Sequence, residues 1–340
     1  MGKNKHMPKV RIAINGFGRI GRQVMRAALN KENVEIVAIN DLTDTKTLAH
    51  LLKYDTAYKQ IAAEVKSDEK NLIINGVSIP VFAVKDPSQL PWADLKIDVV
   101  LECTGRFTKK DDAMLHVKAG ARKVIISAPA KEKDVPTYVR GVNCAKVKEE
   151  VSPVINNASC TTNCIAPVMA VLDETFGIEK AMMSTVHGYT ADQNLQDAPH
   201  KDLRRARAAA ENIVPTTTGA AKAVGEVIGN LKGIFDGVAF RVPVPTCSLS
   251  DIIVVLKKSV TKEEINQALV DAAKSDRFKG ILDCTNEPLV SSDYVGNNFS
   301  SIVDLSLTNV VGGNLVKVVS WYDNEVGYSN RLVEMAELFA

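Results

Sequence analysis

The chain has 340 residues, of which 46% are hydrophobic and 24% are charged, and its formal net charge is +2. This composition is typical of a soluble globular protein long enough for two domains, and so small a charge gives no general argument for a nucleic-acid or membrane partner. The longest apolar runs are too short to span a bilayer, and no apolar segment follows the N-terminal lysines to form a signal peptide. Residues 1–6 are polar and separate from the first strand, so we expect the native start at Met7.

A glycine-rich turn follows the first predicted strand, residues 10–14. Gly16, Gly18 and Gly21 satisfy the G-x-G-x-x-G pattern, and a helix-like stretch and a second strand, 34–39, come next. This order of strand, glycine turn, helix and strand is the dinucleotide-binding fingerprint, in which backbone N–H groups at a helix start hold a pyrophosphate. A tight turn in another α/β domain is the weaker alternative.

Asp41 ends the second strand, 20 residues after Gly21. A carboxylate at this place accepts hydrogen bonds from the ribose hydroxyls and repels a 2′-phosphate. No cation follows it, since the next residue is Leu42. The sequence therefore predicts NAD as the cofactor in preference to NADP.

Further strands and helices alternate through the first half. We expect a helix within 47–58, a hairpin at 72–84 turned at Asn75-Gly76, and a crossover helix at 111–120. Buried strands at 99–105 and 124–129 end in small polar residues, so Thr104 and Ser127 are expected to contact the cofactor at the carboxyl edge of the sheet. Alternation of this kind predicts a doubly wound parallel sheet, a Rossmann fold.

Cys160 opens the second half. Ser159 is a good N-cap, and an apolar helical run follows, which places the cysteine in the first turn of a helix. The positive end of the helix favours a thiolate there, and His187 on the next predicted strand, 180–189, is a candidate base. The alternative is a buried structural cysteine. Cys164, one turn later, is expected to pack within the helix.

The remaining second half reads as strands at 239–245, 252–256, 303–306 and 315–321 with a helix at 262–275, an α+β domain with an antiparallel meander. Arg241 stands among apolar neighbours, so it needs an anionic partner, either a phosphate or a carboxylate of the chain. Thr218 and Gly219 begin a helix and form a possible phosphate cradle, although an ordinary capped helix start explains them equally well. The arginine-rich stretch 192–212 lacks aromatic residues and contains acidic ones, so nucleic acid is not expected as a partner.

The segment from Ala158 to Cys164 resembles the active-site segment of phosphorylating glyceraldehyde-3-phosphate dehydrogenases, and the similarity runs from Lys9 to the C-terminal helix. The resemblance implies an NAD-binding domain at 1–159, a catalytic domain at 160–325, and a helix at 326–340 that packs back on the first domain. Cys160 would attack the aldehyde and His187 would activate it.

The resemblance also implies the residues that bind cofactor and phosphates. For NAD these are Gly16, Gly18, Arg19, Ile20, Gly21, Asp41, Lys85, Thr104, Ser127 and Asn324, where Lys85 could equally be a solvated surface lysine. Thr190 and Arg241 would bind the phosphate of D-glyceraldehyde 3-phosphate. Inorganic phosphate would use Thr161, Arg205, Thr218 and Gly219, and Ser159 would also belong to the substrate- and phosphate-binding residues. Arg241 and Arg205 should then lie in different places.

The family is normally homotetrameric, and the six scattered cysteines suit a reducing compartment, so we expect a homotetramer in the cytoplasm with no metal ligand and no membrane partner. Two alternatives compete with this interpretation. One is erythrose-4-phosphate dehydrogenase, although Thr190 and Thr218-Gly219 argue against it. The other, from a different class, is a scaffold that binds nucleic acid or protein and is an enzyme only secondarily.

Overall fold

The computed structural model describes residues 8–340, so the expected start at Met7 lies outside the described residues. The chain forms two compact units, which are described separately. Unit 1 comprises the chain up to Thr137, Lys146–Asn157 and Ser329–Ala340, and unit 2 comprises Tyr138–Ala145 and Ala158–Tyr328.

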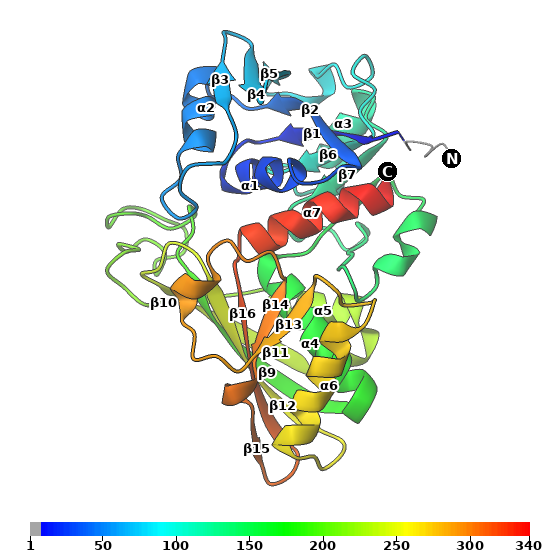
Figure 1. The fold of residues 1–340 in the computed structure, drawn as a ribbon, viewed down its shortest axis with the longest axis vertical. Helices are drawn as coiled ribbons and strands as arrows, with labels where there is room; N and C mark the ends of the chain where they lie inside the picture. Colours follow the sequence, from blue (N-terminus) through cyan, green and yellow to red (C-terminus); the bar gives the residue numbers. More distant parts are fainter. Residues whose placement is uncertain (1–7) are drawn as a thin grey trace, which may run out of the picture. The chain divides into compact units, whose positions relative to one another are not determined.

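Unit 1 contains an eight-stranded sheet (Figure 1). Neighbouring strands from β5 to β8 are parallel, in the order of a doubly wound dinucleotide-binding fold, as predicted. Ligands of such sheets bind at the carboxyl ends of the strands where the order reverses, which here is between β1 and β6. Across the sheet the strands are β3 (Val65–Ser67), β4 (Asn71–Ile74), β5 (Val77–Phe82), β2 (Val34–Asn40), β1 (Val10–Asn15), β6 (Val99–Glu102), β7 (Lys123–Ile126) and β8 (Val154–Asn156).

The predicted hairpin turn is present between β4 and β5. Asn75 has φ 49° and Gly76 has φ 80°, which is the left-handed pair that a two-residue hairpin turn requires. The second strand of this hairpin, β5, ends at Phe82 and has two partners. It runs antiparallel to β4 along most of its length, and its last two residues pair parallel with β2.

Helices connect the parallel strands and cover the sheet of unit 1. α3 packs with a 3₁₀ turn, η1, against β6 and β7, and buried Trp92 fills the layer between them. The C-terminal helix is held within the unit by an ion pair of 3.3 Å between Lys31 and Glu334. The helices are α1 (Arg19–Ala28), α2 (Thr45–Lys53), α3 (Lys110–Lys118) and α7 (Val326–Phe339), and the 3₁₀ turns are η1 (Pro87–Gln89) and η2 (Cys144–Glu149).

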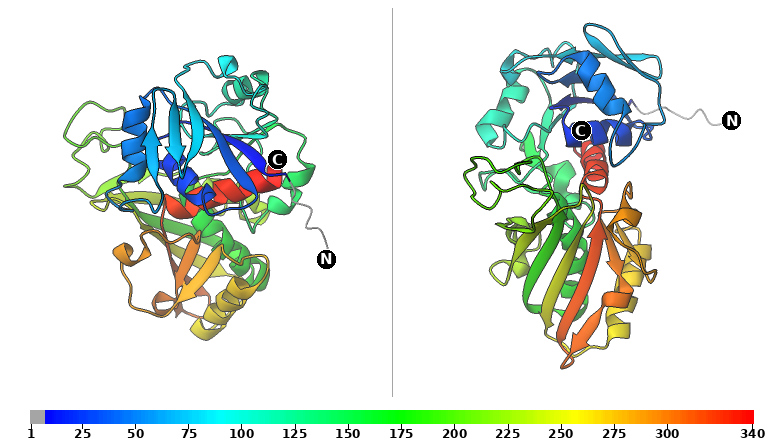
Figure 2. Two further views of the ribbon diagram at one scale, coloured as in Figure 1. Left: turned by 45° about the horizontal axis from the view of Figure 1, so that its top comes forward. Right: turned by 90° about the vertical axis from the view of Figure 1, so that its left-hand side faces the viewer.

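Unit 2 is built on a second sheet, whose strands run lengthwise down the right-hand view of Figure 2. It is mostly antiparallel, but β9 pairs parallel with β11 and β13 with β14, so the expected simple meander is wrong. The parallel pairs arise because a long connection separates the partners, which lets the chain return before it pairs. Across the sheet the strands are β10 (Val214–Thr217), β11 (Phe235–Val242), β9 (Ile178–Gly188), β12 (Ser248–Leu256), β16 (Leu315–Tyr322), β14 (Ser301–Asp304) and β13 (Leu282–Thr285), with β15 (Asn309–Val311) paired to β16.

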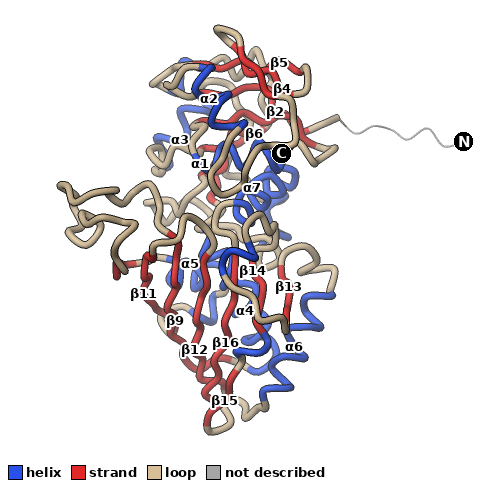
Figure 3. Tube along the Cα trace, turned by 60° about the vertical axis from the view of Figure 1, so that its left-hand side comes forward, coloured by secondary structure: helices blue, strands red, loops and turns tan. Residues whose placement is uncertain are grey.

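Three helices pack on one face of this sheet (Figure 3): α4 (Cys160–Phe176), α5 (Ala220–Val227) and α6 (Lys262–Lys274). Their apolar side chains and those of β9, β12 and β16 form one core. On the other face Met182 and Ile253 remain 67% and 41% exposed. Short 3₁₀ turns complete the unit: η3 (Gly229–Leu231), η4 (Ser291–Tyr294) and η5 (Leu305–Leu307). Among residues 8–340, no helix has the length and apolar character needed to cross a membrane.

Candidate active site

Cys160 is the first residue of α4, as the sequence predicts. The hydroxyl of Ser159 accepts a hydrogen bond of 3.0 Å from the backbone N–H of Thr162, which caps the helix. Immediately before the cap, Ala158 has φ 54°, a conformation that costs energy for a residue with a side chain. Tyr328 stabilises this turn by donating its hydroxyl to the Ala158 carbonyl at 3.0 Å. The nucleophile candidate therefore sits on a sharp, tightly held turn.

His187 lies beside this cysteine near the end of β9. Its Nε2 is 3.5 Å from the Cys160 Sγ. On the other side of the ring, Nδ1 is 2.7 Å from the Gly188 carbonyl oxygen and 3.0 Å from Nη1 of Arg241. The shorter contact assigns the Nδ1 proton to a hydrogen bond with Gly188, which leaves Nε2 as an acceptor directed at the thiol.

The imidazole of His187 is neutral around pH 7. Burial, with the positive charge of Arg241 as a second cause, lowers the pKa of His187 to about 3. A neutral imidazole whose Nε2 faces the sulfur is able to take its proton.

The thiol of Cys160 differs from the expectation that the helix start alone favours a thiolate. Burial raises the pKa of Cys160, against the lowering effects of Arg241 and of the hydrogen bonds from Thr161. Deprotonation of this thiol would therefore need a nearby acceptor such as Nε2 of His187, because a proton moved from sulfur to Nε2 leaves two opposite charges that attract each other. Cys164 is fully buried beside Ser320 and Ser301, and burial raises the pKa of its thiol to about 12, so its predicted packing role is confirmed.

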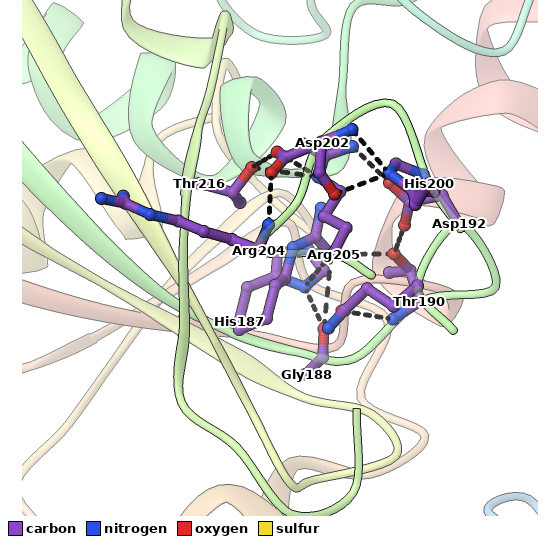
Figure 4. Close-up of polar contacts among 11 residues, drawn as sticks. His187, Gly188, Thr190, Asp192, His200, Asp202, Arg204, Arg205 and Thr216 are labelled. Atoms are coloured by element: carbon purple, nitrogen blue, oxygen red, sulfur yellow. Dashed lines mark hydrogen bonds and ion pairs between the residues drawn. The ribbon is translucent and has the colours of Figure 1, made fainter. Parts of the chain in front are cut away.

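A chain of polar contacts runs from His187 into the loop after β9 (Figure 4). Nη1 of Arg241 donates to the Thr190 hydroxyl at 3.1 Å, and that hydroxyl donates to Asp192. The other carboxylate oxygen of Asp192 pairs with Nη1 of Arg205. The two arginines come from different elements, as predicted, but Thr190 and Asp192 join them into one network.

The start of α5 lies beside the start of α4, because the Thr162 hydroxyl contacts the Ala220 carbonyl at 3.4 Å. Gly219 is the N-cap of α5, and the hydroxyl of Thr218 accepts from the Ala220 N–H at 3.2 Å. Nε of Arg205 donates to Thr216 at 3.0 Å, two residues before Thr218. Two helix N-termini, both attractive to anions, therefore come together near the cysteine.

Two further site residues of unit 2 are fixed by hydrogen bonds. The Asn324 Oδ1 accepts from the Ser248 hydroxyl at 3.0 Å, so its amide nitrogen is left free to donate elsewhere. The same serine accepts from the Gly188 N–H at 3.2 Å, next to His187. The Thr161 hydroxyl is bonded to the Tyr322 hydroxyl at 2.9 Å and lies 4.0 Å from the Cys160 sulfur.

In unit 1 the glycine turn has the geometry of a dinucleotide cradle. A Cβ on Gly21 would lie 2.2 Å from the Gly16 carbonyl oxygen, and one on Gly16 would lie 2.7 Å from the Thr104 nitrogen. A Cβ on Gly18 meets no protein atom within 4 Å, so protein packing does not require this glycine, and the open space suits the close approach of a ligand. The Asp41 carboxylate accepts from the Phe17 N–H at 2.8 Å, which places it against the turn.

The other predicted cofactor residues of unit 1 differ in their exposure and in their hydrogen bonds. The guanidinium of Arg19 pairs with Asp55 at 2.6 Å. The backbone N–H groups of Arg19 and Ile20 lie at the start of α1, directly after the glycine residues. Lys85 is exposed after β5. Ser127 follows β7, and its N–H bonds to the Glu102 carbonyl at 3.0 Å. Thr104 gives both its N–H and its hydroxyl to the Glu102 carboxylate.

Sequence reasoning missed Glu102 and Asp192. The Glu102 side chain is fully buried and also contacts Asn15 at 2.5 Å and His116 at 3.2 Å, beneath the cofactor edge of the sheet. A charged residue in the buried strand β6 is a signal in itself, since buried charges need partners. Asp192 carries no such signal, because an acidic residue in a polar loop is ordinary.

A dinucleotide cradle in one unit and a cysteine–histidine pair with two arginines in the other define a class of protein, the cofactor-dependent dehydrogenases that work through a cysteine. Two family models match the chain: "Glyceraldehyde 3-phosphate dehydrogenase, NAD binding domain" over residues 10–110 and "Glyceraldehyde 3-phosphate dehydrogenase, C-terminal domain" over residues 159–324. The chain belongs to the glyceraldehyde 3-phosphate dehydrogenase family.

Individual relatives agree with this assignment. A glyceraldehyde-3-phosphate dehydrogenase of Geobacillus stearothermophilus is 56% identical over 331 residues, 97% of this chain and 98% of the relative. One of Priestia megaterium is 57% identical over 331 residues with the same coverage, and one of Streptomyces coelicolor is 55% identical over 327 residues, 96% of this chain and 97% of the relative. These names support the family's own reaction and neither of the two alternatives.

Proposed function

We propose that the chain catalyses the oxidative phosphorylation of D-glyceraldehyde 3-phosphate to 1,3-bisphosphoglycerate with reduction of NAD, a step of glycolysis. The observation that carries the chemistry is the 3.5 Å contact between Cys160 Sγ and His187 Nε2 at a helix start, in a chain of this family. The thiol supplies a nucleophile, and the imidazole supplies a base at the correct distance.

In the proposed mechanism His187 takes the thiol proton as the sulfur attacks the aldehyde carbon, which forms a thiohemiacetal on Cys160. The imidazole, now protonated at Nε2, and the Cys160 N–H stabilise the developing oxyanion, and the imidazole gives its Nε2 proton to that oxygen to complete the thiohemiacetal hydroxyl. His187 then accepts the hydroxyl proton of the thiohemiacetal as a hydride leaves the carbon, and a thioester results. Inorganic phosphate attacks the thioester carbon, the sulfur leaves, and the acyl phosphate is released.

NAD supplies the hydride acceptor when bound. The open space at the Cβ position of Gly18 and the first-turn N–H groups of Arg19 and Ile20 suit a pyrophosphate, and Asp41 suits the ribose hydroxyls. Gly16, Gly21, Lys85, Thr104 and Ser127 complete this set in the proposal, with Asn324 for the nicotinamide carboxamide. The negative charge of Asp41 makes NAD the preferred cofactor over NADP.

Two anion sites serve the two phosphates. Arg241 and Thr190 bind the phosphate of the aldehyde, and this assignment is supported by the Nε of Arg241, which is buried without a hydrogen-bond partner among residues 8–340. Inorganic phosphate is bound by Arg205 and by the two helix starts, through Ser159, Thr161, Thr218 and Gly219. The buried Thr161 hydroxyl, 4.0 Å from the Cys160 sulfur, supports this second assignment.

The proposal extends to domains, assembly and location. Residues 1–159 with the helix 326–340 bind the cofactor, and residues 160–325 carry out the chemistry. We also propose a homotetramer in the cytoplasm, with no nucleic acid as a partner.

The test is NADH formation from glyceraldehyde 3-phosphate and NAD, with and without inorganic phosphate. We expect a burst close to one NADH per site without phosphate and sustained turnover with it. Erythrose 4-phosphate under the same conditions should react far more slowly. Sustained turnover that does not depend on phosphate would contradict the proposal.

A further inference from the structure

We propose that the carboxylate of Asp192 is a built-in competitor of phosphate, which occupies donors of both anion sites and so sets the phosphate concentration that the enzyme needs. This inference rests on the assignment of Arg205 to inorganic phosphate in the proposed function. Asp192 itself has no assigned role there.

The carboxylate of Asp192 contacts residues of both proposed anion sites. One oxygen of Asp192 accepts from the Thr190 hydroxyl, and the other pairs with Nη1 of Arg205 (Figure 4). Thr190 in turn contacts Arg241 at 3.1 Å. Arg205 and Arg241, with these hydrogen bonds, hold the pKa of Asp192 below its usual range although its partial burial acts in the opposite direction, so the carboxylate is charged around pH 7.

The hydroxyl of Thr190 has a single proton to donate. A guanidinium only donates, so the Thr190 oxygen must accept from Arg241, and its proton is left for Asp192. A substrate phosphate at Arg241 could receive that proton only if the hydroxyl turned away from Asp192. The carboxylate therefore holds a donor that the first anion site uses.

Two nitrogens of the Arg205 guanidinium already have partners within the protein. Its Nε is engaged by Thr216 at 3.0 Å and lies 3.4 Å from Asp202, and its Nη1 is engaged by Asp192. A guanidinium binds phosphate best through two parallel N–H groups. With Nη1 taken, a phosphate either binds through Nη2 alone or displaces Asp192, and in both cases it meets a like charge.

A different interpretation is that Asp192 orients Arg205 and so helps phosphate to bind. The structure favours competition, because Thr216 and Asp202 already hold the Nε end of the guanidinium. The side chain of Asp192 is also 44% exposed, so it can swing into solvent when an anion arrives.

The experiment compares the wild type with Asp192→Asn and Asp192→Ala. Two like charges about 4 Å apart in watery surroundings change an equilibrium constant by about fivefold. We therefore expect both variants to lower the KM for inorganic phosphate by about fivefold or more. A second readout needs no turnover: the phosphate concentration that half-protects Cys160 from alkylation by iodoacetamide should fall by the same factor.

Asp197→Asn is the matched control. Asp197 lies on the same loop and pairs with Arg207 at 2.8 Å, so its replacement removes an equal charge from a place outside the network. We expect it to leave the phosphate KM and the half-protection concentration unchanged. Melting temperatures measured without phosphate check that all three variants fold.

A phosphate KM and half-protection concentration that stay unchanged or rise in both Asp192 variants would overturn the inference, and a rise would show that Asp192 orients Arg205. An equal decrease in the Asp197 variant would also overturn it, since the effect would then be one of overall charge. Failure of the proposed function is a separate result, because it would appear as wild-type NADH formation that does not depend on phosphate. The alkylation readout would still decide the role of Asp192 in that case.

Discussion

The glycine turn of unit 1 and the cysteine site of unit 2 both lie at the first turn of a helix, but different charged groups contact them. At the glycine turn the Asp41 carboxylate accepts from the Phe17 N–H at 2.8 Å, and the Arg22 guanidinium donates to the Phe17 carbonyl at 2.9 Å. The guanidinium of Arg19 pairs with Asp55. At the cysteine site the guanidinium of Arg241 contacts His187, and that of Arg205 pairs with the carboxylate of Asp192.

The difference is consistent with the two kinds of anion in the proposed function. The glycine turn offers backbone N–H groups and open space, which suit a pyrophosphate whose other contacts spread along a large cofactor. In the proposal the cysteine site holds small, mobile phosphates, and for these guanidinium and hydroxyl groups would provide most of the binding energy. Substitutions should therefore affect the two sites independently.

The largest expected effect is that of Cys160→Ser, which should abolish turnover and leave NAD binding nearly unchanged. A serine hydroxyl is a far weaker nucleophile, and the residue lies outside the dinucleotide-binding unit. NADH formation and NAD titration measure the two properties. Cys164→Ser is the control and should keep its activity, since Ser320 and Ser301 surround that thiol. Substantial turnover by the Cys160 variant would refute the thiol mechanism.

The next effect is that of His187→Asn, which should slow turnover by about a hundred- to ten-thousandfold, as is usual for a lost general base. It should also raise the apparent pKa of Cys160 alkylation. Without the imidazole the thiol loses the base at 3.5 Å, and only Arg241 and the hydrogen bonds from Thr161 then oppose the rise in pKa that burial causes. The rate of iodoacetamide alkylation against pH measures this shift, with slower reaction at pH 7. An unchanged profile with unchanged turnover would remove His187 from the mechanism.

The two arginines should then separate the two phosphates. Arg241→Leu should raise the KM for the aldehyde and lower kcat, because binding of the remote phosphate positions the reacting carbon. Arg205→Leu should slow the phosphate-dependent step and leave the first NADH burst largely intact. Hydrogen bonds to charged groups contribute about 1.5–3 kcal/mol, so each effect should be about tenfold or more.

Arg207→Leu is the control for both arginine variants, since this residue on the same loop pairs with Asp197 and not with the network. Burst and steady-state kinetics with varied aldehyde and phosphate separate the steps. If only Arg241→Leu altered the phosphate dependence, the two anion sites would be assigned in reverse.

The features that the sequence predicted well depend on neighbours in the chain. The glycine turn, the Asn75-Gly76 hairpin and the Ser159 cap are each encoded within a few residues, and short-range sterics and hydrogen bonds decide them. The mixed pairing of the second sheet was missed because it depends on which distant strands meet, which periodicity does not specify.

In the candidate site, too, the sequence predicted the features encoded locally and missed those that depend on the fold. The sequence indicated Cys160 and His187 as separate residues, but the 3.5 Å contact between them comes from two elements 27 residues apart. The helix start predicted a thiolate, whereas the burial that raises the thiol pKa is a property of the folded site. Glu102 and Asp192 were missed for a similar reason, since each acts through partners that only the fold brings close.

The smallest effect is expected at Asp41, where Asp41→Asn and Asp41→Ala should narrow the preference for NAD over NADP. The carboxylate would face a 2′-phosphate with like charge, and removing one such repulsion changes an equilibrium constant by about fivefold. Asn removes the charge and keeps an oxygen for the Phe17 N–H, whereas Ala also removes that hydrogen bond, so Asn isolates the charge. The ratio of kcat/KM for the two cofactors measures the preference. Phosphate KM should not change in either variant, because the anion sites lie in unit 2, and a change there would mean that the two sites are not independent.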